Sequence, residues 1–179
     1  MLVGEPHGVE QTPRVLYTLV RRLGLRGLAL EWAEEELEDL DLERLWQLPA
    51  DAELFSGDGR ITAGHFALIE GLRRAARLDQ LVLLDRVGSV SPERERGMAE
   101  QLRRELRPGI RLLAVVGAGH LTPGAPLREA FPEAPVAVLD YRGGSCFFNG
   151  VRALAPLPEL SAIRLTLGAA APAVVPVRD

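Results

Sequence analysis

Short apolar runs alternate with longer amphipathic stretches along the first 142 residues of the chain. Five runs have the length and composition of buried strands: 1–4, 27–32, 80–85, 111–116 and 135–141. Four intervening stretches repeat apolar residues at helical spacing: 12–24, 34–48, 61–78 and 91–106. Strands separated by helices indicate an α/β fold, in which a mostly parallel central sheet lies between two layers of helices.

Residues that favour helix ends mark the boundaries of these amphipathic stretches. Thr12 is expected to cap the first helix, with Pro13 at its first helical position. Thr62 and Ser91 are suited to cap two later helices, because a side-chain oxygen can accept a hydrogen bond from an otherwise unpaired backbone N–H of the first turn. The caps support the helical interpretation of these stretches.

The pattern changes after Arg142. Short strand-like runs at 143–154, 162–168 and 172–178 are interrupted by glycine and proline. Such runs are typical of antiparallel strands at a sheet edge. We therefore expect one α/β domain over residues 1–179, with a core at 1–142 and a C-terminal β extension at 143–179.

Composition narrows the class of protein. The net charge of −4, from 25 acids and 21 bases, argues against a nucleic-acid partner. Every base is arginine, so chemistry through a lysine Schiff base is excluded. Cys146 is the only cysteine and cannot form an internal disulfide. No leader-like segment and no run of membrane-spanning length is evident, and we expect a cytoplasmic protein with a small-molecule substrate and no membrane partner.

Polar side chains follow the predicted strands at the points where the strands end. Glu5 and His7 follow the first strand, Glu31 ends the second, Asp85 ends the third and His120 follows the fourth. The C-terminal ends of parallel strands meet at one edge of a sheet, here called the carboxyl edge, and ligands bind there. Two of the three histidines are therefore expected to lie close together.

This set of side chains suits two kinds of chemistry. Two neutral imidazoles with one or two carboxylates can bind zinc, manganese or iron, and His7, Glu31 and His120 are the candidate ligands. The same residues without metal can activate water by general base catalysis. Nearby glycines, at positions 4, 8, 117 and 119, would let the backbone turn sharply beside a ligand.

Three further residues are candidates for supporting roles. His65, beside the loop "SGDGR", would be a second acid–base group or a lid residue. Arg60 or Arg142 would hold an anionic substrate group or a developing oxyanion.

Structural alternatives exist for several of these residues. His65 has the alternative of a surface or capping role. Glu31 has the alternative of pairing with an arginine such as Arg26 or Arg60. Asp85 has the alternative of forming a salt bridge to Arg86 or to a helix. The stretch "VVGAGHLTPG" also resembles a dinucleotide-binding turn, but it lacks the third glycine and two prolines interrupt the helix that should follow.

Three motifs together resemble the erythromycin esterase-like and ChaN-like superfamily. They are "GEPHG" at 4–8, "LALEW" at 28–32 and "GAGH" at 117–120. The superfamily shares its Gly-x-x-His motifs with the TraB and TIKI proteins. The resemblance covers about residues 1–142, and it implies a parallel α/β fold with its site at the carboxyl edge.

The resemblance also implies roles for individual residues. By similarity to the esterases, Glu5, His7 and Glu31 would take part in water activation. By similarity to the TIKI-like proteins, His7 and His120 would bind a divalent metal together with a glutamate. ChaN-like members are associated with haem and iron. This chain is much shorter than the esterases and lacks their extra helical domain, so their substrates are not expected to carry over.

The sequence thus favours a small hydrolase that attacks an ester or amide. His7 would be the general base or a metal ligand, Glu5 and Glu31 would orient it or share the metal, and His120 would complete the cluster. The alternatives are a metal- or haem-binding module without turnover and a degenerate relative that keeps only the shape of the site. An aromatic content of 5% makes the chain poorly suited to a haem site.

Overall fold

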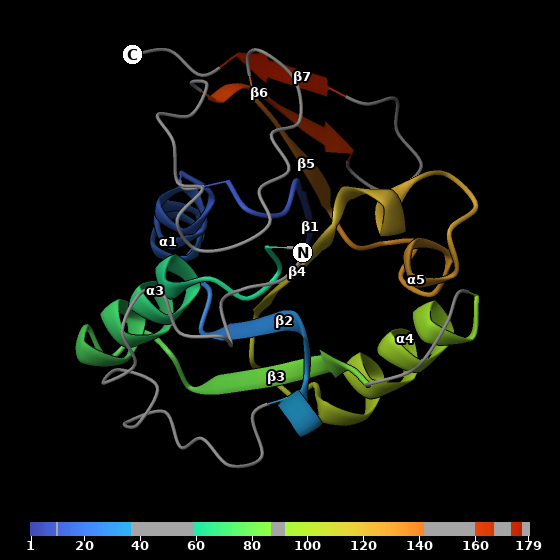
Figure 1. Ribbon diagram of the computed structural model, residues 1–179, viewed down its shortest axis with the longest axis horizontal. Helices are drawn as coiled ribbons and strands as arrows, with labels where there is room; N and C mark the ends of the chain where they lie inside the picture. The colour runs from blue at the N-terminus through green and yellow to red at the C-terminus, as the bar shows by residue number, and fades with distance from the viewer. Residues whose placement is uncertain (10, 37–58, 87–91, 142–159, 167–172, 177–179) are drawn as a thin grey trace.

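A parallel sheet of five strands forms the centre of the computed structural model (Figure 1), which describes residues 1–9, 11–36, 59–86, 92–141, 160–166 and 173–176. The strands are β1 (Leu2–Glu5), β2 (Gly27–Ala33), β3 (Gln80–Asp85), β4 (Leu112–Gly117) and β5 (Val136–Tyr141). They lie side by side in the order β3-β2-β4-β1-β5, and all four neighbouring pairs are parallel. The predicted α/β fold is confirmed.

Helices pack against this sheet through two separate hydrophobic clusters. The first cluster joins the sheet to α1 (Thr12–Leu23) and α3 (Ala63–Arg74), with Leu16 and Phe66 among its buried members. The second joins it to α4 (Glu93–Glu105) and α5 (Pro126–Glu129), with Met98 and Leu127 buried. Alternate residues of a strand enter opposite clusters, as Leu28 and Ala29 of β2 do, because successive side chains of a strand point to opposite faces. Figure 1 shows α1 and α3 together, well separated from α4 and α5.

The topology makes the connections diverge at the carboxyl ends of β1 and β4, which are neighbours in the sheet. After β1 the chain turns toward the cluster that contains α1, whereas after β4 it turns through η3 (Ala118–Leu121) toward the cluster that contains α5. Connections that leave adjacent strands in opposite directions mark the usual ligand position in an open α/β sheet. The fold therefore places this point of divergence at the carboxyl edge.

Two further strands extend the sheet beyond β5. They are β6 (Leu160–Thr166), antiparallel to β5, and β7 (Ala173–Pro176), antiparallel to β6. The predicted C-terminal extension at 143–179 falls mainly outside the described residues, as do Arg142 and Cys146. The predicted division of the domain into a core and an extension stays a prediction.

The helix boundaries match the sequence expectations closely. Thr62 caps α3 and accepts a hydrogen bond from the backbone N–H of His65, as predicted. The N-cap of α1 is Gln11 rather than Thr12, which is the first helical residue. The predicted cap at Ser91 is wrong in the same way, because the N-cap of α4 is Pro92. Most of the helix expected at 34–48 lies outside the described residues, and η1 (Glu34–Glu36) is the part that is described. Within the described ranges, no helix combines the length and hydropathy needed to cross a bilayer.

Candidate functional site

The turn after β1 presents the first two site residues. Glu5 is the last residue of β1 and is 4% exposed, and His7 follows it on a turn that ends at Gly8, where φ is 75°. The backbone N–H of Gly8 donates to the carbonyl of Gly59 at 3.0 Å. A Cβ at Gly59 would lie 2.6 Å from the Gly8 nitrogen, so this approach requires glycine. Residues far apart in sequence thus fix the position of His7.

Glu5 is held from behind by His65. The His65 Nε2 atom lies 3.3 Å from both carboxylate oxygens of Glu5, and its Nδ1 lies 2.8 Å from the Thr62 hydroxyl. Burial alone would raise the pKa of Glu5, but the charge and hydrogen bond of His65, together with His7, hold this pKa below its usual value. Glu5 is therefore a buried carboxylate that stays ionised.

His65 is a buried positioning residue rather than a lid or surface residue. Its exposed fraction is 2%, and its ring meets the ring of Trp32 edge-on at 6.0 Å between centroids. The lid interpretation is therefore wrong, because a lid must reach solvent and move. The first turn of α3, with its Thr62 cap, fixes the imidazole against Glu5 instead. His65 has no open side from which to contact a substrate directly.

His7 lies between two carboxylates. Its Nδ1 is 3.7 Å from Glu5 Oε1, and its Nε2 is 3.9 Å from Glu31 Oε2. The side chain is 16% exposed, whereas both glutamates are almost fully buried. His7 therefore presents an imidazole edge toward solvent while two negative charges lie behind it.

Gly117 gives the His7 ring its space. A Cβ on Gly117 would lie 2.8 Å from His7 Nε2 and 3.5 Å from Glu31 Oε2. The backbone N–H of Gly117 also donates to Glu31 Oε2 at 2.6 Å. The expectation that glycines permit sharp turns explains only Gly8 here, since Gly117 has an ordinary φ of −55°. Close approach, not backbone conformation, is what requires glycine at position 117.

Glu31 is the centre of the cluster. Besides the Gly117 N–H, it accepts hydrogen bonds from His120 Nε2 at 3.2 Å and from Arg94 Nη2 at 2.5 Å. Burial would raise its pKa, but His120, the Gly117 N–H and His7 lower the pKa to about 2. Glu31 is thus negatively charged at neutral pH, and its hydrogen-bond donors come from β4, η3 and α4.

His120 bridges two acids. Its Nε2 contacts Glu31, and its Nδ1 lies 3.3 Å from Glu95 Oε1 in the first turn of α4. The hydrogen bond to Glu31 raises the pKa of His120 despite partial burial, and Glu95 adds to the effect. The side chain is 17% exposed, so His120 offers a stabilised imidazolium at the surface of the cluster.

The arginine partner of Glu31 differs from those considered in the sequence. Arg94 pairs with Glu31, whereas Arg26 pairs with Asp79 and Arg60 pairs with Asp85. Asp85 itself joins the network, because Arg94 Nη2 lies 2.5 Å from its Oδ2 and Arg60 Nη1 lies 2.9 Å from the same atom. Glu31 therefore does pair with an arginine, as the structural alternative supposed, but the arginine is Arg94 and not Arg26 or Arg60.

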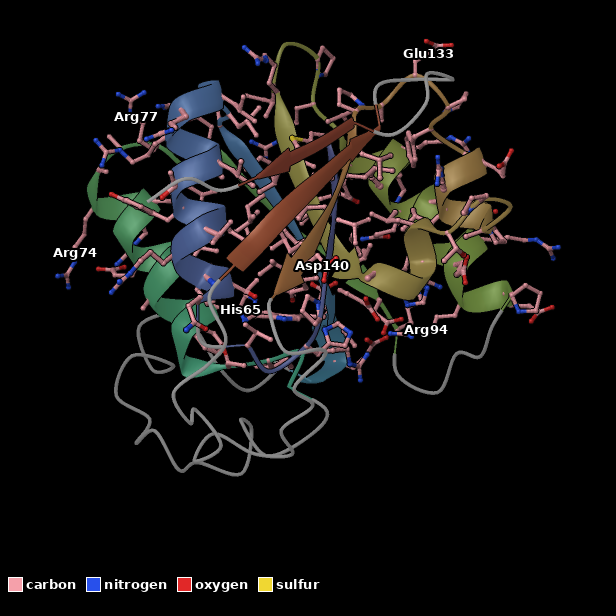
Figure 2. All side chains as sticks on the ribbon, turned by 90° about the horizontal axis from the view of Figure 1, so that it is seen from above. His65, Arg74, Arg77, Arg94, Glu133 and Asp140 are labelled. Carbon is pink, nitrogen blue, oxygen red and sulfur yellow. The ribbon has the colours of Figure 1, made fainter. Side chains whose placement is uncertain are left out.

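The structure therefore brings five sequence-predicted residues into one network: Glu5, His7, Glu31, His65 and His120. Arg60 is linked to it through Asp85 and Arg94. Figure 2 shows His65, Arg94 and Asp140 at the same end of the sheet. The acids of the network are almost fully buried, whereas His7, His120, Arg94 and Arg60 are partly exposed. At the carboxyl edge, the acids are therefore less exposed than these four bases.

Two residues of α4 were missed by the sequence reasoning. Arg94 and Glu95 lie in the charged stretch "SPERERG", which has the composition of a solvated helix face. A signal for Glu95 was present, because it begins the helical stripe of Met98, Ala99 and Leu102 that faces the core. Arg94 has no such signal, since its two partners come from β2 and β3.

The donor set fits a hydrogen-bonded acid–base cluster better than a metal centre. Both oxygens of Glu31 already accept from cationic or backbone donors, and the Arg94 guanidinium lies on the oxygen that His120 also contacts. A cation there competes with a metal for the same carboxylate. Across the described ranges, no group of three or more His, Cys, Asp and Glu side chains has a metal-binding arrangement.

Comparisons of the chain with models of protein families, with curated proteins and with solved structures found no match. The resemblance to the erythromycin esterase-like and ChaN-like superfamily therefore rests on three short motifs and stays a prediction. The interpretation of the site depends on its geometry.

Proposed function

We propose that the protein is a hydrolase in which His7 activates water for attack on an ester or amide carbonyl. The observation that carries the proposal is the position of His7. It is a partly exposed imidazole with Glu5 beside one ring nitrogen and Glu31 beside the other. A histidine oriented by a buried carboxylate is the usual arrangement of a general base.

In the proposed reaction, His7 accepts a proton from water while the water oxygen attacks the substrate carbonyl. Glu5 Oε1 lies 3.7 Å from His7 Nδ1, beyond hydrogen-bond length, and its negative charge favours a proton on that nitrogen, so that Nε2 is the atom that accepts the proton. The imidazolium formed in this step is stabilised by Glu31, whose pKa of about 2 keeps it ionised throughout the working range of pH. Collapse of the tetrahedral intermediate expels the alcohol or amine, which takes the proton back from His7.

His120 has a different role in this scheme. Glu31 raises the pKa of His120, and Glu95 holds its other nitrogen, so the ring carries positive charge over a wider pH range than a free histidine. Its exposed edge can stabilise the developing oxyanion. His65 does not contact the substrate and instead orients Glu5. Arg60 stays a candidate for binding an anionic substrate group.

The metal- and haem-binding alternatives have weaker support in the arrangement of side chains. A metal held by His7, Glu31 and His120 would have to displace Arg94 from Glu31. A haem site needs an axial ligand beside a broad apolar surface, but the apolar cavity at the opposite edge of the sheet has no histidine among the described residues that line it. Elemental analysis of the purified protein, with and without dialysis against a chelator, tests both alternatives.

The test of the proposed function is hydrolysis of a panel of chromogenic esters and anilides in water enriched in oxygen-18. We expect hydrolysis above the uncatalysed rate for part of the panel, with the heavy oxygen incorporated into the product acid. His7→Gln is expected to reduce kcat/KM by about 100-fold or more, the usual loss on removing a general base.

Arg77→Gln is the matched control, since Arg77 is exposed and distant from the carboxyl edge (Figure 2). It should hydrolyse the panel at the wild-type rate. A folded wild-type protein that hydrolyses no member of the panel would contradict the proposal. Hydrolysis that His7→Gln leaves intact would contradict the role of His7.

A further inference from the structure

The edge of the sheet opposite the site, here called the amino edge, contains an apolar cavity of about 600 Å³. Its walls are the last turns of α1 and α4, the first residues of β1 and β4, and the segment that leads into β5. Most of its lining side chains are aliphatic; among the described residues that line it, Phe131 is the one aromatic ring and Arg111 the one charged side chain. The volume lies within the range of small-molecule sites in proteins.

The cavity is open to solvent at an apolar rim. Leu23 at the end of α1 is 38% exposed, and Leu106 at the end of α4 is 43% exposed. These are the two large hydrophobic side chains that the described part of the chain exposes, and both line this cavity. Exposed apolar surface that borders a concavity is a mark of a binding site, because an ordinary core would bury it.

Positive charge at the mouth of the cavity favours a ligand with a negatively charged group. The arginines in the last turns of α1, α3 and α4 complement the negative ends of the helix dipoles. Arg111 is not accounted for in this way, because it precedes β4 and lies outside any helix. Arg107 lies one turn away, since its carbonyl accepts the N–H of Ile110, and both arginines are exposed. Glu133 is labelled at this edge in Figure 2, and neither it nor the other described acids of this edge, Asp79 and Glu105, line the cavity.

We propose that the amino-edge cavity binds a single-chain anionic amphiphile, namely an aliphatic chain that carries a carboxylate. The chain would lie among the leucines, where it displaces no bound polar group, and the carboxylate would face Arg111. Cavities lined by aliphatic side chains hold water poorly and accept apolar ligands. A concave site suits one chain better than a bilayer surface, which is contacted by apolar side chains that protrude.

Calorimetric titration of the full chain with monomeric dodecanoate tests the proposal. We expect saturable binding of one dodecanoate per protein. Dodecyltrimethylammonium, which has the same chain with a positive head, is expected to bind at least tenfold more weakly. Arg111→Gln should weaken dodecanoate binding by about two- to fivefold, as expected of an ion pair that remains in contact with solvent. Arg77→Gln is the matched control and should bind as the wild type does, because Arg77 does not line the cavity.

A second variant tests the cavity itself. Ala134 is half-buried and lines the cavity, so Ala134→Trp would fill part of it and reduce affinity by tenfold or more. If Ala134→Trp fails to fold by thermal melting, Leu106→Ser replaces it, since Leu106 is exposed and tolerates a polar residue.

Three results would overturn the proposal. They are the absence of saturable binding, equal affinity for the anionic and cationic amphiphiles, and unchanged affinity in the cavity variant that folds. Sedimentation with phosphatidylglycerol vesicles distinguishes a membrane contact. Co-sedimentation without binding of monomeric dodecanoate would replace the proposed site with a lipid-surface patch.

Discussion

Charged side chains are buried and paired at the carboxyl edge of the sheet, whereas at the amino edge they are exposed around an apolar cavity. Two arginines show the contrast. Arg94 is 20% exposed and donates to two buried acids, Glu31 and Asp85, which hold its pKa above the usual value. Arg111 is exposed at the mouth of a cavity whose other described lining side chains are uncharged. The same side chain is part of a buried network in one region and a solvated charge in the other.

The difference follows from the direction of the parallel strands. At the carboxyl edge, the chain leaves β1 and β4 in opposite directions, so backbone donors such as the Gly117 N–H become available to side chains such as Glu31. Buried acids can be satisfied there. At the amino edge, the helix C-termini present leucines and arginines, and no described acid lines the cavity. One edge is therefore suited to proton transfer and the other to binding of apolar groups.

Removing the centre of the buried network should have the largest effect. Glu31→Ala leaves His120 and Arg94 without a shared acceptor, and we expect the free energy of unfolding to fall by about 3–5 kcal/mol. Arg26 and Asp79 form an ion pair at the amino edge, and their side chains are 37% and 41% exposed. Asp79→Ala removes this pair and should lower the free energy of unfolding far less than Glu31→Ala does. Urea denaturation of both variants measures the contrast. Equal losses would show that the two edges do not differ in this respect.

Acid should destabilise the carboxyl edge through Glu31. Its pKa falls from the ordinary 4.5 to about 2 on folding, so its contribution is present above pH 4.5 and is lost as pH falls toward 2. The shift corresponds to ~3 kcal/mol. The pKa of His120 is raised from 6.5, so its contribution is present below pH 6.5 and is lost as pH rises through the folded pKa. We expect urea denaturation to give the highest free energy of unfolding between pH 4.5 and pH 6.5. Glu31→Gln should reduce the loss of stability below pH 4.5.

Adding a methyl group at position 117 should show how far hydrolysis depends on the position of His7, because it changes no charge of the site. Gly117→Ala keeps every ionisable group but places a Cβ 2.8 Å from His7 Nε2. We expect hydrolysis to fall tenfold or more, with a stability loss of about 1–3 kcal/mol, typical of overpacking. Steady-state kinetics and denaturation measure the two effects. Gly97→Ala is the control, because no atom lies within 4 Å of its added Cβ. Unchanged hydrolysis in Gly117→Ala would show that the position of His7 is not critical.

Polar substitutions at the rim of the amino-edge cavity should have the smallest effect on stability. Leu23→Ser and Leu106→Ser change side chains that are already substantially exposed, and each should alter the free energy of unfolding by no more than about 0.5 kcal/mol. Thermal melts test this expectation. A loss of several kcal/mol in either variant would mean that these leucines belong to the core, which would remove the basis for a binding cavity.

The sequence predicted the fold and the clustering of the site for a simple physical reason. Apolar runs define strands, and the residue after each strand must lie at the carboxyl edge of a parallel sheet. The positions of Glu5, His7, Glu31 and His120 at or just after strand ends were enough to predict that they lie close together. It depends on the order of strands and helices, which periodicity reveals, and not on any detail of packing.

The remaining site residues could not be assigned in the same way. Arg94 reaches Glu31 and Asp85 from a helix that follows β3, and such pairing depends on the lateral order β3-β2-β4, which local periodicity does not encode. His65 was placed near the start of a predicted helix, but its positioning role could not be assigned because its partner, Glu5, is 60 positions away. The amino-edge cavity was missed because its leucines have the spacing of ordinary core residues in α1 and α4.

The central claim is that His7 performs the chemistry while His65 holds the structure. The most direct measurement compares kcat/KM for an ester and the free energy of unfolding in His7→Gln and His65→Gln. We predict that His7→Gln loses about 100-fold or more in kcat/KM and less than about 1 kcal/mol in stability. We predict that His65→Gln loses about 1–3 kcal/mol in stability, because Glu5 is left without its buried donor. Wild-type kcat/KM in His7→Gln would contradict the claim.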